Sequence, residues 1–76
     1  MCVQVTLDIG GTAYDLTLDV SAGQTPASVA VMFCNQRLVE FDLTAQSMVR
    51  LCVEPVQRHL QTVLEKESPQ HSLHEL

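Results

Sequence analysis

Apolar and polar residues alternate strictly in two stretches near the start of the chain. The stretches are residues 2–9, CVQVTLDI, and residues 12–20, TAYDLTLDV. Successive side chains of a strand point to opposite faces, so this period of two is typical of strands with one buried face. The apolar positions that would share that face are Val3, Val5, Leu7, Ile9, Tyr14, Leu16, Leu18 and Val20.

Gly10 and Gly11 separate the two stretches and predict a two-residue hairpin turn, because glycine accepts the positive φ angles of such turns without strain. The turn fixes the pairing: Ile9 would lie opposite Thr12, with every other apolar residue then on the same face. A slip of one residue would place the two apolar sets on opposite faces. The predicted pairs after the first are Leu7 with Tyr14, Val5 with Leu16, and Val3 with Leu18.

A helix is predicted from Thr25-Pro26 to about Gln36, because threonine caps free amides and proline suits a first helical turn. Its inner face comprises Val29, Ala30, Phe33 and Cys34. Val31 and Met32 are apolar as well, and a helix that is apolar all round needs cover on more than one side. One hairpin is too small to provide that cover.

Residues 44–66 predict a second helix, with Thr44 as its cap. Pro55 has no amide hydrogen and crowds the preceding turn, so a kink or a break into two helices is expected there. Leu51 lies on the face opposite the apolar stripe. The stripe comprises Ala45, Val49, Cys52, Val53, Val56, Leu60, Val63 and Leu64.

These elements predict an α+β fold, a β-hairpin followed by two or three helices. The pattern of residues 38–41 is compatible with either a connector or a short third strand. Residues 1–67 would form a single small domain. Residues 68–76 are polar and unpatterned, which suggests a flexible tail or the start of a linker.

The chain is acidic, with a net charge of −5 and no Lys or Arg in its first 36 residues. Nucleic acids and anionic membranes attract clustered positive charge, so neither is an expected partner. No apolar run approaches the length of a membrane span.

The three cysteines, Cys2, Cys34 and Cys52, are widely spaced and do not suggest a disulfide framework. We therefore expect Cys34 and Cys52 to be buried and inert, in a reducing cytoplasmic location.

No residue pattern predicts catalysis, a cofactor or a metal. Asp8, Asp15 and Asp19 lie on the polar strand face without the converging loop that a hard cation needs. The histidines and Cys52 lack the paired spacing of a zinc site. A nucleophilic Cys–His pair needs an electropositive setting that the apolar surroundings of the cysteines do not offer. The three histidines are His59, His71 and His74.

Residues 2–36 resemble the opening of a ubiquitin-like β-grasp domain. The resemblance rests on VQVTLDI, a glycine turn, YDLTLDV, a short loop and a helix that starts at Thr25. It implies a protein-interaction scaffold without catalytic residues. Residues 44–66 depart from that family, because they read as helix where further strands should follow. The chain also has no C-terminal Gly-Gly, so conjugation to other proteins is not implied.

The predicted function is a non-catalytic protein–protein interaction module, most simply an oligomerisation or docking domain of a larger protein. The alternative is a small accessory domain of an enzyme whose catalytic region lies elsewhere. A lone hairpin is rarely stable and leaves both strand edges free, which favours a homodimer. Another protein is the alternative partner. The predicted interface residues are Val31, Met32 and Leu51.

Overall fold

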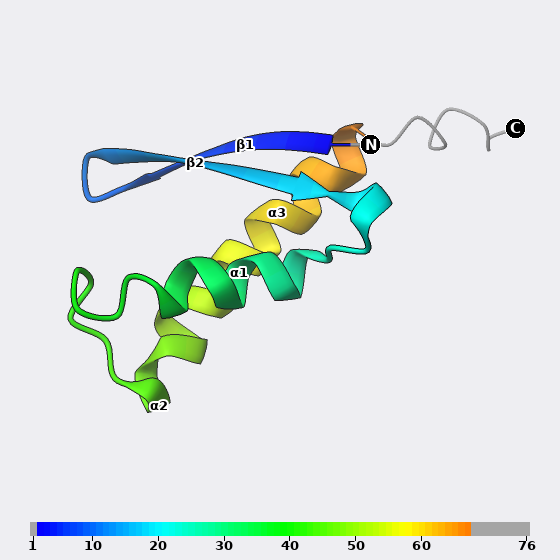
Figure 1. The fold of residues 1–76 in the computed structure, drawn as a ribbon. Coiled ribbons are helices and arrows are strands. Elements are labelled where there is room, and N and C mark those ends of the chain that lie inside the picture. The colour runs from blue at the N-terminus through cyan, green and yellow to red at the C-terminus, as the bar shows by residue number, and fades with distance from the viewer. Residues whose placement is uncertain (1, 68–76) are drawn as a thin grey trace, which may run out of the picture.

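The computed structural model describes residues 2–67, and residues 68–76, with the predicted tail, His71 and His74, lie outside them. The fold is α+β, as the sequence predicts, with a hairpin lying along one side of the helices (Figure 1). The elements are strands β1 (Cys2–Ile9) and β2 (Thr12–Asp19), the 3-10 turn η1 (Val20–Ala22), helix α1 (Pro26–Asn35), helix α2 (Ala45–Met48), the π-helical segment η2 (Val49–Val53) and helix α3 (Glu54–Glu67).

The hairpin has the predicted register. Ile9 pairs with Thr12 beside the turn, and the antiparallel ladder continues through Val3 and Leu18 to its far end. Gly10 and Gly11 have φ angles of 61° and 85°, in the left-handed region that glycine adopts without strain. The alternation of buried and exposed residues is cleanest in β1, which places one face of the hairpin in the core.

Helix α1 begins at the predicted cap. The Thr25 hydroxyl accepts a hydrogen bond from the Ser28 amide, and the Ser28 hydroxyl accepts one from the Thr25 amide. This reciprocal pair satisfies two amides that the first helical turn leaves free. The predicted inner face is the buried one, and it comprises Val29, Ala30, Phe33 and Cys34.

Residues 36–42 form consecutive turns and make no strand, so the connector reading of residues 38–41 is the correct one. The Phe41 amide donates to the Arg37 carbonyl, and the Leu43 amide donates to the Leu38 carbonyl. Asp42 adopts a positive φ of 54°, where the chain turns toward the second helical stretch. Thr44 then caps this stretch, as predicted, by accepting from the Ser47 amide.

The second helical stretch passes from α2 through η2 into α3, so a π-helical segment ends at Val53, two residues before Pro55. The Glu54 amide bonds to the Val49 carbonyl, five residues back, and Pro55 has no amide to give Leu51. The sequence prediction of a kink or a two-helix break at Pro55 did not foresee this π-helical arrangement. The wider turn also shifts the phase of the residues before it. Val49, predicted for the buried stripe, is therefore 45% exposed.

The core lies between the hairpin, α1 and the η2–α3 stretch, and helices α1 and α3 pack against each other. The largest fully buried side chains among residues 2–67 are Leu18, Leu60 and Cys34. After α1, the described residues contain no further strand, which is where the chain departs from a β-grasp domain. Among the helices of residues 2–67, none combines the length and the apolar composition that a membrane span requires.

Candidate functional site: an apolar groove along strand β1

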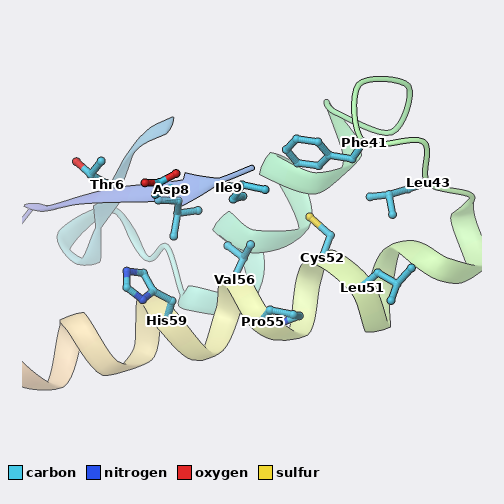
Figure 2. A pocket seen from close by; sticks show the side chains of 11 residues that line it. Thr6, Asp8, Ile9, Phe41, Leu43, Leu51, Cys52, Pro55, Val56 and His59 are labelled. Atoms are coloured by element: carbon cyan, nitrogen blue, oxygen red, sulfur yellow. The ribbon is translucent and has the colours of Figure 1, made fainter. Parts of the chain in front are cut away.

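An open groove of about 780 Å³ lies between strand β1 and the η2–α3 stretch (Figure 2). Thr6 and Asp8 lie along β1 on one side, and Leu51, Pro55 and His59 lie along the helical stretch on the other. Its size falls within the usual range for sites that bind small molecules or peptide side chains. The remaining lining residues are Leu7, Ile9, Phe41, Leu43, Cys52 and Val56.

Aromatic packing positions one end of the groove. The Phe41 ring meets the Tyr14 ring edge-on, with 5.7 Å between the centroids, and Tyr14 meets Phe33 in the same way at 5.5 Å. The Arg37 guanidinium lies 4.2 Å from the centroid of Phe33 and also donates to the Phe33 carbonyl. These contacts connect the 36–42 turns to β2 and α1, and so hold Phe41 beside the groove.

The Tyr14 hydroxyl donates a hydrogen bond to the Glu40 carboxylate. This bond, together with partial desolvation and the negative charge of Glu40, raises the pKa of Tyr14 above its ordinary value of 10.0, although the nearby Arg37 charge opposes the shift. Tyr14 lies in β2 and Glu40 in the 36–42 turns. The hydrogen bond therefore adds to the aromatic packing as a second contact between the hairpin and the segment that contains Phe41.

The structure places Val31, Met32 and Leu51 at exposed positions. The side chains of Val31 and Met32 on α1 are 44% and 57% exposed, and Leu51 on η2 is 68% exposed. Leu51 lines the groove, whereas Val31 and Met32 do not. Neither the hairpin nor the second helical stretch covers the two α1 residues, so the excess of apolar surface expected from the sequence is present on the outside of the molecule.

The prediction for Cys34 and Cys52 is half right. Both side chains are buried, at 0% and 5% exposure, but they form a disulfide and are not free thiols. This disulfide could not be predicted from the sequence, because the two cysteines are 18 positions apart and only the packing of α1 on η2 brings their Cα atoms to a separation of 6.0 Å. Cys2, in β1, is free and exposed.

The disulfide also affects the chemistry of the groove. Cys52 and His59 both line the groove, but a sulfur held in a disulfide supplies no thiolate nucleophile.

Two aspartates of the polar strand face accept hydrogen bonds from nearby residues. Asp15 accepts from the Thr6 hydroxyl, and Asp19 accepts from the Ala22 amide. Within residues 2–67, no three His, Cys, Asp or Glu side chains are grouped as metal ligands would be.

The groove itself was not predicted from the sequence. The only available signal was that Phe41 and Leu43 are apolar residues in a connector, where solvent-facing residues are usually polar.

Comparisons with protein-family models, curated proteins and solved structures found no match to this chain.

Proposed function

We propose that this chain is a non-catalytic protein–protein interaction module that acts as an oligomerisation or docking domain. The observation on which the proposal depends is the exposure of Val31, Met32 and Leu51. Full burial of one such side chain is worth about 1.5–3 kcal/mol, so covering several of them with a partner would be strongly favourable.

A second copy of the chain is the proposed partner on α1. A small domain buries a limited part of its surface and gains much from association, and a two-fold axis would cover the same apolar residues on both copies at once. The resemblance of residues 2–36 to a ubiquitin-like opening supports an interaction role as well. No feature of residues 2–67 specifically favours the alternative role, an accessory domain of an enzyme.

A cytoplasmic location, expected from the cysteine pattern, remains a prediction. The Cys34–Cys52 disulfide weighs against it, because structural disulfides persist mainly in oxidising compartments. Mapping the oxidation state of the three cysteines in protein taken directly from its source cells would decide between a cytoplasmic location and an oxidising compartment.

The proposal is tested by the mass of the protein in solution. We expect a two-chain mass at micromolar concentration, and a one-chain mass for Met32→Asp, because burying an unpaired carboxylate is costly. Since Met32 is exposed, the variant should keep its helical circular dichroism. Gln57→Asp, which places the same charge at an exposed polar position on α3, is the matched control and should remain dimeric. A one-chain mass for the unmodified protein at high concentration would exclude self-association.

A further inference from the structure

The groove follows the free edge of β1. Thr6, Leu7, Asp8 and Ile9 all line it, although successive residues of a strand point to opposite faces. Four consecutive residues can border one groove only along the edge of their strand. In the part of the chain that the structure describes, the sheet has two strands, so β1 has β2 on one side and the groove on the other.

The backbone of Thr6 and Asp8 points into this groove. In a hairpin with a two-residue turn, the pair beside the turn, Ile9 with Thr12, exchanges both hydrogen bonds, and bonded pairs then alternate with non-bonded ones. Thr6 and Asp8 belong to non-bonded pairs, so their N–H and C=O groups point away from β2. None of the hydrogen bonds among residues 2–67 outside the ladder uses these backbone groups.

An added strand suits this site better than a second copy of the hairpin does. Residues of a third strand would alternate between the groove and the outer face, so apolar side chains could enter the space between β1, Leu51 and Val56. The apolar side chains of a second β1 strand are already buried against helices of their own chain. A second copy would therefore pair its backbone and leave the groove unfilled.

The charge of the hairpin indicates which residues the outer face of the added strand should have. Asp8 and Asp15 are exposed on the polar face, and residues 1–36 contain no Lys or Arg. Opposite charges on neighbouring strands stabilise the pairing, and like charges destabilise it. The net charge of −5 would in addition attract a basic segment from a distance.

We propose that the β1 edge binds an extended segment of a partner protein as a third, antiparallel strand, in which apolar residues enter the groove and alternating basic residues lie beside Thr6 and Asp8. The inference rests on the proposed role as a protein-binding module. The β1 edge is then a second binding surface, separate from Val31 and Met32. The segment that binds it would alternate apolar and basic residues.

The probe is a labelled peptide of about eight residues, a common strand length, that alternates isoleucine with lysine. Its binding to the full chain is followed by fluorescence anisotropy. We expect affinity to fall as salt is added, and a peptide with glutamate in place of lysine should not bind. Equal binding of the glutamate peptide would overturn the proposal.

Methylation of the peptide backbone tests the strand register on the unmodified protein. In an antiparallel ladder, residues directly opposite each other share a face, and a residue opposite an outward-facing backbone bonds back to it. The lysines therefore lie opposite Thr6 and Asp8, and their amides point toward β1. Methylating the lysine amides should weaken binding by about tenfold or more, since two hydrogen bonds are lost. Methylating the isoleucine amides, which point away, should leave the affinity unchanged. Equal effects of the two methylated peptides would overturn the strand geometry.

The matching protein variant is Thr6→Pro, which removes the outward amide without touching the ladder to β2. It removes one hydrogen bond to the added strand, so it should weaken binding by less than methylation of the lysine amides, which removes two. Thr17→Pro removes the equivalent amide from the other edge of the hairpin and should bind normally. Thr6→Val keeps the amide and removes only the hydroxyl that bonds to Asp15, so it measures the part of the loss that comes from the side chain. A Thr6→Pro variant that binds like the unmodified chain would contradict the proposal.

The mass measurement separates this inference from the proposed function. If the lysine peptide fails to bind while Met32→Asp still splits a dimer, the β1 proposal is wrong and the interaction module stands. If Thr6→Pro itself converts a dimer to a folded monomer, the edge belongs to a second copy, which also overturns the peptide assignment. Binding of the peptide to a protein that is monomeric at all concentrations would support the β1 site and exclude the α1 dimer.

Discussion

The sulfur atoms of Cys34 and Cys52 form a disulfide that joins the last turn of α1 to η2, with the two Cα atoms 6.0 Å apart. It fixes the helix pair at the end of the core that also borders the groove, because Cys52 is one of the lining residues. The position of η2, which carries Leu51 and Cys52 of the groove, is therefore covalently constrained relative to α1.

Reducing this disulfide should lower the free energy of unfolding by about 3 kcal/mol, since closing a loop of this length restricts the unfolded chain. Urea unfolding with and without a reductant measures the difference. Cys2→Ser, which removes the free thiol in β1, should show the same difference and serves as the control. Three titratable thiols in denatured, unreduced protein, where one is expected, would contradict the pairing.

Replacing both Gly10 and Gly11 with valine should lower the free energy of unfolding by about 2–4 kcal/mol. The φ angles of both residues are positive, and a branched side chain is strained there even though a Cβ at either position would meet no neighbour. Thermal unfolding checks the loss. Gly10→Asn should be nearly neutral, because Asn-Gly is a favoured sequence for this turn. Unchanged stability of the double valine variant would refute the strained-turn explanation.

Tyr14 should ionise above its ordinary pKa of 10.0, because its hydroxyl donates to the Glu40 carboxylate. As Tyr14 is the only tyrosine, its phenolate absorbance reports this residue directly. The bond favours the neutral phenol, so its contribution to stability is complete below the ordinary pKa and is lost as the pH rises through the higher pKa of the folded protein.

Glu40→Ala should shift the Tyr14 titration to lower pH. Glu54→Ala, which removes an equal charge from the start of α3, is the control and should leave the titration in place. A curve for Glu40→Ala that overlays that of the unmodified chain would show that the hydrogen bond does not determine the pKa. Circular dichroism over the same pH range establishes that the protein stays folded.

Leu60→Ala should lower the free energy of unfolding by about 3–5 kcal/mol, because this side chain is fully buried and its removal leaves a cavity. Leu51→Ala makes the same chemical change at a 68% exposed position and should lower it by less than about 0.5 kcal/mol. Urea unfolding of the two variants measures both effects. A large loss for Leu51→Ala would mean that Leu51 supports the fold and is not held available for a partner.

The local structure could be predicted from residues that are close together in the chain. The hairpin register follows from two alternating stretches around Gly10-Gly11, and the starts of the two helical stretches follow from Thr25 and Thr44. These features depend on neighbours a few positions apart: a turn that needs positive φ, a side chain that caps an amide, and a period that selects one face. The inner face of α1 was predictable for the same reason.

Features that depend on contacts between distant residues became apparent only from the packing of the elements. Cys34 meets Cys52 and Tyr14 meets Glu40 only because α1, β2 and the 36–42 turns pack together, and no local pattern encodes that packing. The π-helical turn before Pro55 changed the phase of the helix, so Val49 lies outside the buried stripe to which its spacing assigned it. The groove exists because the η2–α3 stretch lies beside the edge of β1 without closing on it, and these two elements are 40 or more positions apart in the chain.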